Sequence, residues 1–255
     1  MQNQNMMKGG IWKKILFYMM IVVVWELAYR FINFPSPLKV FQNISKLIES
    51  GTLGTAVMIS LRRLLSGYII SLFIGLLIGL FMLKLKATRD NFAKLIGALQ
   101  TMPNVCWVPF AVLWFGLNEK AILFVIIIGS VFAVSMSIES GIKNLNPNYI
   151  RVAEMTGAKG YTLYKEVIFP AAIPVIISGI KQGWAFAWRG LIAGEMIASS
   201  MSGLGEILTH GKKYNDINEI VAVMVVIIVI GLLIDRIVFE NIESSIRRKF
   251  GLGKA

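Results

Sequence analysis

Apolar runs separated by short polar segments form the main pattern of the 255-residue chain. The runs occupy residues 15–31, 61–83, 92–115, 121–138, 171–199 and 220–234. Most of them approach or exceed the ~20 residues that an α-helix needs to cross a bilayer. Within each run the apolar residues are continuous, whereas a membrane barrel would alternate apolar and polar residues. The pattern therefore predicts an all-α integral membrane protein with about six transmembrane helices.

Composition and charge agree with this prediction. Hydrophobic residues make up 56% of the chain, and a soluble domain of this length has too little interior to bury that much apolar surface. The net charge of +12 comes mainly from lysines and arginines in loops and at the ends of runs. Because cytoplasmic loops of membrane proteins are rich in these residues, we expect both termini to be cytoplasmic. The charge gives no reason to expect a nucleic-acid partner.

Residue types typical of catalysis or metal binding show no useful spacing. Cys106 is the only cysteine, which excludes a disulfide within the chain. The sequence lacks the P-loop motif G-x-x-x-x-G-K-[ST], which binds nucleotide phosphates. The chain therefore has no such motif for ATP hydrolysis. We therefore expect no catalytic residue, no metal site and no cofactor.

Two prolines follow the first run and divide the chain. Pro35 and Pro37 restrict their neighbours to extended geometry, and a mildly polar segment comes after them. We interpret residues 1–54 as an N-terminal transmembrane helix with an external linker, 55–245 as the main transmembrane domain and 246–255 as a basic cytoplasmic tail. A cleaved signal peptide is the alternative for the first run, but no small-residue cleavage site follows it.

Small residues recur at every fourth position of the second run: Gly67, Ser71, Gly75 and Gly79. This spacing places them along one ridge of a helix, where small side chains let a second helix approach closely. We expect helix packing there rather than a ligand site.

The third run is interrupted by Pro103 and Pro109, and proline removes a helical hydrogen bond and clashes with the preceding turn. Polar Gln100 and Asn104 lie beside the interruption. Irregular backbone at membrane depth is tolerated where it is buried in protein or lines a cavity. The interruption is thus either part of a translocation pathway or a packing kink.

The fifth run is unusually polar for a membrane helix. Lys181, Trp184, Trp188 and Glu195 share one face at 100° per residue, and Arg189 lies on another. Arg189 and Glu195 point in different directions, so each needs a partner on another helix or a substrate. Ionisable residues inside a membrane usually face a bundle interior or a watery cavity. Structural pairing and pathway lining both remain open for these residues.

A polar segment, residues 146–170, separates the fourth and fifth runs. Asn146 is a good helix cap, and Pro147 suits the first helical position. The helix can continue to about Thr156, and Gly157 is the natural residue to end it. The pattern alone is equally compatible with an ordinary interfacial loop and with a specialised surface helix.

Sequence motifs in and around this segment resemble binding-protein-dependent ABC transporter permeases of the nitrate, sulfonate and taurine type. The first set matches the signature loop of that family: Val152-Ala153, Gly157, Val167 and Phe169-Pro170. Further similarity lies in Phe34-Pro35-Ser36-Pro37, Leu113-Trp114-Phe115-Gly116, Gly194-Glu195-Met196 and Gly203-Leu204-Gly205. Arg151 departs from the pattern, because the family has glutamate there. The resemblance extends over about residues 34–250.

The resemblance implies a type I ABC importer permease fold in which residues 146–170 form a cytoplasmic coupling helix. It implies contact with a separate ATPase subunit through Arg151, Val152, Ala153, Glu154, Thr156, Gly157 and Ala158. The expected assembly is a homodimer in a bacterial plasma or inner membrane, with two ATPase subunits inside and a substrate-binding protein outside. The candidate pathway residues are Gln100, Asn104, Lys181, Trp184, Trp188, Arg189 and Glu195.

The substrate is less well defined. Arg189 and Lys181 suit a small anion such as a sulfonate, taurine, nitrate or bicarbonate, whereas Trp184 and Trp188 suit a flat ring such as a thiamine-pathway pyrimidine. A secondary transporter without an ATPase is an alternative, although no internal repeat of the kind common in such carriers is visible. A membrane-embedded enzyme is a further alternative, and it lacks a catalytic constellation.

Overall fold

The computed structural model describes residues 2–32, 35–85, 87–198 and 202–249. Within these ranges the chain is almost entirely helical and contains no strand. The helices before the polar segment are α1 (Gln2–Ile32), α2 (Pro37–Glu49), α3 (Thr52–Lys84), α4 (Arg89–Gln100), η1 (Asn104–Trp107), α5 (Val108–Phe115) and α6 (Glu119–Lys143). The remaining ones are α7 (Pro147–Met155), α8 (Gly160–Leu163), η2 (Tyr164–Ile168), α9 (Phe169–Ile197), α10 (Leu204–Lys213), α11 (Ile217–Ile234), η3 (Asp235–Phe239) and α12 (Glu240–Lys249).

Four helical stretches among the described residues are long and apolar enough to cross a membrane: Thr52–Lys84, Glu119–Lys143, Gly160–Ile197 and Ile217–Ile246. The pair Arg89–Gln100 and Asn104–Phe115 counts as a fifth stretch if its 94° bend belongs to one span. This bend confirms the interruption predicted at Pro103. The predicted first span, residues 15–31, falls in α1, so the total of six spans stays a prediction.

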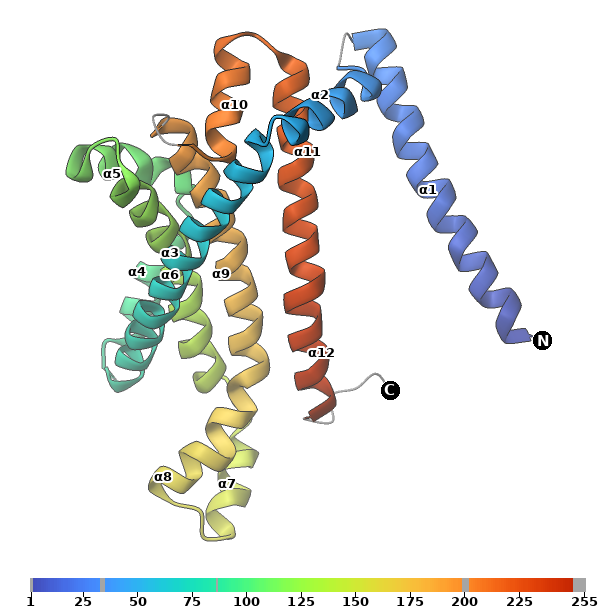
Figure 1. Ribbon diagram of the computed structural model, residues 1–255. Helices are drawn as coiled ribbons and strands as arrows, with labels where there is room; N and C mark the ends of the chain where they lie inside the picture. The colour runs from blue at the N-terminus through green and yellow to red at the C-terminus, as the bar shows by residue number, and fades with distance from the viewer. Residues whose placement is uncertain (1, 33–34, 86, 199–201, 250–255) are drawn as a thin grey trace.

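Helix α6 is the centre of the bundle, packed between α3 and α9 (Figure 1). The small residues of α3 make this packing possible. A Cβ atom added to Gly75 would lie 2.7 Å from Val134 Cγ1, and one added to Gly79 would lie 2.8 Å from Ile138 Cβ. The ridge predicted from the four-residue spacing is thus confirmed as the contact surface between α3 and α6.

The bundle has two distinct ends (Figure 1). We call the end that carries α7 and α8 the inner end, and the opposite end, which carries α10, the outer end. Helices α3 and α9 run in opposite directions between them, α3 toward the inner end and α9 toward the outer end.

Helix α1 stands apart from the bundle and joins it through α2 at the outer end (Figure 1). Trp25 Nε1 donates a hydrogen bond to the carbonyl oxygen of Pro35 at 3.0 Å, and the Trp25 ring lies 6.5 Å from that of Phe41. Large apolar side chains such as Met19, Val22 and Leu27 remain exposed along α1. They give α1 a surface suited to lipid or to another membrane chain.

Candidate functional site

Helix α7 is a short helix with defined ends at the inner end of the molecule. The Asn146 side chain accepts a hydrogen bond from the backbone N–H of Asn148 at 3.0 Å, and Pro147 occupies the first turn. After Thr156 the chain turns at Gly157, whose φ is +91°, a left-handed conformation that residues with a Cβ rarely adopt. The helix start at Pro147 and the stop at Gly157 therefore agree with the capping signals in the sequence.

The inward face of α7 is anchored in a small apolar cluster. Ala153 is buried together with Leu163 and Ile168, and Ile142 at the end of α6 packs against them. Beyond the helix, the N–H of Ala158 donates to the carbonyl oxygen of Ala153 at 2.9 Å. Ala153 and Ala158 thus position α7 on the bundle, and Ile142 connects it directly to α6.

The outward face of α7 is apolar and exposed. The exposed fractions are 58% for Tyr149, 60% for Val152 and 87% for Met155. Arg151 and Glu154 are also exposed, and neither takes part in an ion pair with another described residue. Tyr149 and Met155 were not among the residues predicted from sequence. Their spacing with Val152, three residues apart on a polar helix, was the signal that could have identified them.

A second candidate site is a cavity of about 370 Å³ beside the bend between α4 and η1, lined in part by Gln100, Asn104, Phe186 and Arg189. The Asn104 side-chain amide donates to the carbonyl oxygen of Phe186 at 2.6 Å. The Arg189 guanidinium carbon lies 5.5 Å from the centre of the Phe186 ring. We call this space the bend cavity. It brings together three of the predicted pathway residues: Gln100 from α4, Asn104 from η1 and Arg189 from α9.

Arg189 stands out in this cavity because it is exposed and no ion pair between described residues includes it. A guanidinium can bind a carboxylate, sulfonate or nitrate through two parallel N–H donors. The bend cavity is therefore chemically suited to a small anion.

Lys181 lies elsewhere on α9. Its ammonium nitrogen is 2.8 Å from Asp235 Oδ1, where α11 continues into the π-helical turn η3. Both side chains are partly exposed, at 36% and 40%. The positive charge of Lys181 is thus already matched by a carboxylate on a neighbouring helix.

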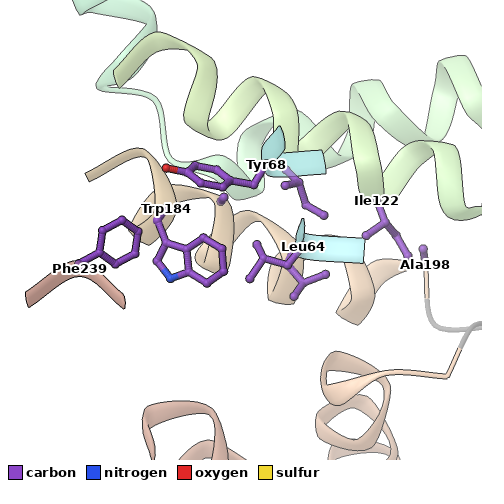
Figure 2. Close-up of a cluster of buried hydrophobic side chains, with 9 residues drawn as sticks. Leu64, Tyr68, Ile122, Trp184, Ala198 and Phe239 are labelled. Carbon is purple, nitrogen blue, oxygen red and sulfur yellow. The ribbon is translucent and has the colours of Figure 1, made fainter. Parts of the chain in front are cut away.

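Trp184 belongs to the largest buried apolar cluster (Figure 2). Its ring stands edge-on to Tyr68 at 5.2 Å and lies 5.9 Å from the Phe239 ring. Trp188, half-buried, packs against the same cluster. Trp184 therefore offers no free ring face for a ligand in this conformation.

Glu195 is fully buried near the outer end, in a network of hydrogen bonds. The Ser60 hydroxyl lies 2.9 Å from both carboxylate oxygens. Arg63 Nη1 donates to Oε1 at 2.9 Å, and the N–H of Gly205 donates to Oε2 at 3.0 Å. This arrangement favours structural pairing for Glu195, one of the two alternatives left open by the sequence.

The network around Glu195 also holds Ser202 and the first residues of α10, Leu204 and Gly205. The N–H of Leu204 donates to the Ser60 hydroxyl at 3.0 Å, and Arg63 Nη1 donates to the carbonyl oxygen of Ser202 at 2.8 Å. Arg63 Nη2 donates to Glu119 at 3.1 Å. We call these residues the outer network; it connects α3, α6, α9 and α10.

An inner cluster of charges lies where α6 meets α4. Glu139 is 3% exposed, and its Oε1 lies 3.5 Å from Arg89 Nε and 3.8 Å from Lys143 Nζ. Lys143 also donates to Asp90 at 2.7 Å. Neither Glu139 Oε1 nor Arg89 Nε has a hydrogen-bond partner in the part of the chain described. The contact could not be predicted from sequence, because it joins Arg89 and Asp90 of α4 to Glu139 and Lys143 on the separate helix α6.

His210 has a partner at the outer end. Its Nδ1 lies 3.0 Å from Glu219 on α11, although the ring stays largely exposed. The described residues contain no group of histidine, cysteine, aspartate or glutamate side chains that could hold a metal ion.

Comparison with known proteins defines the class. Residues 71–248 match the family described as "Binding-protein-dependent transport system inner membrane component". The chain belongs to this family of transport permeases, and it is a multi-pass membrane protein. The family is a transport component and not itself a catalyst.

Several individual relatives are similar to this chain over most of its length. A Methanocaldococcus jannaschii protein described as an ABC transporter permease is 33% identical, over 88% of this chain and 86% of its own. A Bacillus subtilis protein described as an aliphatic sulfonates transport permease is 28% identical, with 90% and 84% covered. The nitrate import permease protein of a Synechocystis strain is 25% identical, with 86% and 83% covered.

Among solved structures, an amino acid ABC transporter crystallised with histidines aligns with a TM-score of 0.64 at 17% identity. The alignment covers 80% of this chain and 97% of that one. At this identity the similarity concerns the fold, which is that of a type I ABC importer permease. The predicted fold class is confirmed.

Proposed function

We propose that this permease works as a homodimer, in which each copy binds one ATPase subunit through α7 and both receive substrate from an external binding protein. The observation that carries the proposal is the exposed apolar face of α7, on a helix anchored to the bundle through Ala153. Exposed apolar patches of this kind are typical of protein interfaces. The exposed apolar side chains of α1 support a second membrane partner, either lipid or the other copy.

The proposed mechanism transmits movement of the ATPase through α7 to the transmembrane helices. The contact surface consists of Val152 and Met155, with Arg151, Glu154 and Thr156 at its edge. Gly157 and Ala158 shape the turn that follows, and Ala153 transmits the displacement to Ile142 on α6. The ATP-bound ATPase can drive the permease only if it binds one conformation of the permease more tightly than the other. In this assignment the inner end faces the cytoplasm, as do both termini.

We further propose that the substrate is a small organic or inorganic anion that passes the bend cavity. Arg189 supports this assignment, because its charge is not matched by an acidic group of the described residues. Two relatives are described as sulfonate and nitrate permeases. The burial of Trp184 weakens the flat-ring alternative. Gln100 and Asn104 would contribute polar contacts, whereas Glu195, Lys181 and Trp184 would hold the pathway helices in place.

The coupling role of α7 is tested by a double variant, Val152→Asp and Met155→Asp. We expect the variant to insert in the membrane and form dimers, but to lose capture of the ATPase and substrate-stimulated ATP hydrolysis. The reason is that two carboxylates would replace the apolar contact. The measurement is ATPase activity and uptake in proteoliposomes that contain the permease, its ATPase and its binding protein.

The matched control is Val152→Ile with Met155→Leu, which keeps the surface apolar and should retain both activities. Full activity of the aspartate variant would rule out α7 as the coupling helix.

The role of Arg189 is tested in the same vesicles by Arg189→Gln. We expect the uptake of an anionic substrate to fall about tenfold or more, which corresponds to the loss of one charge-assisted hydrogen bond of ~1.5 kcal/mol. Lys120→Gln, an exposed change near the outer end, is the control. Unchanged uptake of every anion by the Arg189 variant would remove the bend cavity from the pathway.

A further inference from the structure

A groove with a volume of about 1030 Å³ lies beside the bundle at the inner end. One wall is the last part of α3, with Leu77, Phe81 and Lys84. The other wall is formed by α8, η2 and the first residue of α9, with Tyr161, Lys165 and Phe169. We call it the inner groove. Its volume exceeds the 370 Å³ of the bend cavity, and its lining is mostly apolar.

On both walls of the groove, the lining changes from apolar to basic residues toward the inner end. Along α3, the apolar residues Leu77 and Phe81 come before Lys84, which is the last residue of the helix. Along the opposite wall, Lys165 precedes Phe169 as the chain enters the bundle. Since the two walls run in opposite directions (Figure 1), the groove is apolar toward the middle of the bundle and basic toward the inner end.

The two lysines have no acidic partner in the described parts of the chain, since no ion pair there includes Lys84 or Lys165. Lys165 Nζ lies 5.8 Å from the centre of the Tyr161 ring. Tyrosine and lysine are typical of the boundary between the hydrocarbon and the headgroups of a bilayer. Leu77, Phe81 and Phe169 are each about half exposed within the groove.

We propose that the inner groove binds an anionic glycerophospholipid, with its acyl chains along Leu77, Phe81 and Phe169 and its headgroup phosphate between Lys84 and Lys165. The order of apolar and basic residues on both walls matches the order of chain and headgroup in such a lipid. Anionic headgroups are attracted by basic residues close to the membrane surface. The assignment to the cytoplasmic leaflet rests on the proposed function, which places α7 in the cytoplasm.

A second copy of this chain fits the groove less well. The exposed α1 is the obvious candidate from a partner copy, but the sequence near its beginning contains Lys8, Lys13 and Lys14. Any arrangement that put this basic segment of a second copy into the groove would add positive charge to that of Lys84 and Lys165. Like charges in a medium of low polarity repel strongly. Charge complementarity therefore favours the anionic lipid.

The lipid would also have a mechanical role. Lys165 lies in η2, which is connected to α7 through the short helix α8, whereas Lys84 ends the transmembrane helix α3. A phosphate shared by the two lysines would tie the segment that carries α7 to the bundle. A bound anionic lipid is therefore expected to increase the fraction of ATP hydrolysis that is coupled to uptake.

The test is native mass spectrometry of the detergent-purified permease, titrated with phosphatidylglycerol and with phosphatidylcholine of identical acyl chains. We expect phosphatidylglycerol to bind at least fivefold more tightly than phosphatidylcholine. Lys84→Gln with Lys165→Gln should abolish this preference. Lys212→Gln with Lys213→Gln, two exposed lysines at the outer end, is the matched control and should preserve it.

Equal binding of the two lipids, or an unchanged preference in the Lys84 and Lys165 variant, would overturn the proposal. So would a cross-link between Phe81→Cys and an α1 cysteine of the other copy in delipidated protein, since the groove would then be occupied by the partner. Capture of the ATPase by the same preparations separates this inference from the proposed function. If capture is normal while the lipid preference is absent, only the lipid site fails.

Discussion

Two buried carboxylates mark opposite ends of the bundle, Glu195 in the outer network and Glu139 in the inner cluster. Glu195 has hydrogen bonds to both oxygens from Ser60, Arg63 and Gly205. Glu139 is almost as buried, yet its Oε1 accepts no hydrogen bond from a described residue. The cations beside it are partly exposed, with Arg89 at 28% and Lys143 at 34%.

The different hydrogen bonding of the two carboxylates indicates how firmly the helices are held at each end of the bundle. A buried charge is stable only when it is paired and its remaining hydrogen-bonding capacity is used, as it is for Glu195. The outer network therefore holds α3, α9 and the loop before α10 in one arrangement. The inner cluster holds α4 against α6 through ion pairs of 3.5–3.8 Å to Glu139, whose cations are partly exposed. We infer that the inner end rearranges more easily, which suits the end that carries α7.

The largest predicted effect is that of Glu195→Ala. Removal of the carboxylate leaves Arg63 buried without its closest acidic partner, and broken buried ion pairs lower stability by about 3–5 kcal/mol. We expect the variant to show a clearly lower unfolding temperature in detergent, or to fail to accumulate. A stability within ~1 kcal/mol of wild type would contradict the view of Glu195 as a structural residue.

A double-mutant cycle with Arg63→Met sharpens this result. If the two groups act as a pair, the double variant should be no less stable than Glu195→Ala alone, because no unpaired charge remains buried.

An intermediate effect is expected for Gly203→Ala. A Cβ at this position would lie 2.5 Å from Glu195 Oε1, which is held by its hydrogen bonds and cannot move freely. Overpacking of this kind lowers stability by about 1–3 kcal/mol. Gly54→Ala is the control, because a Cβ there meets no atom within 4 Å. The same thermal unfolding experiment should separate the two variants, and equal stabilities would mean that the outer network tolerates displacement.

The smallest effect is expected for Glu139→Gln. The lost interactions are longer than hydrogen bonds and involve partly exposed cations, so the loss of stability should stay below ~1.5 kcal/mol. Hydrogen exchange measured by mass spectrometry should nevertheless become faster in α4, because Arg89 would lose its buried partner. A loss of stability as large as that of Glu195→Ala would remove the contrast between the two ends.

Local signals in the sequence predicted much of this architecture. The apolar runs gave the transmembrane helices, the four-residue spacing from Gly67 to Gly79 gave the contact of α3 with α6, and Pro103 gave the bend. Asn146, Pro147 and Gly157 gave α7 with correct ends. Each of these features depends on residues that are close together in the chain, and for this reason a single sequence was enough to predict them.

The partners of the charged residues could not be predicted in the same way. Arg63 and Glu195 are 132 residues apart, and Lys181 pairs with Asp235 on another helix. Helical periodicity predicts Lys181, Trp184 and Glu195 on one face of α9, but it carries no information about which helix covers that face at each level. Lys181 and Glu195 have acidic or basic partners on other helices, whereas Arg189 is exposed. Only the packing of the bundle reveals this difference.

The most direct test of the coupling role of α7 uses the single native cysteine, Cys106, which is exposed. In a Cys106→Ser background, Met155→Cys places one thiol on the outward face of α7, and Ser50→Cys places one at the outer end as a control. The permease is mixed with its ATPase and treated with a short thiol-to-amine cross-linker. Our account predicts a covalent permease–ATPase product for the Met155 variant alone. No product from that variant, or equal product from both, would contradict it.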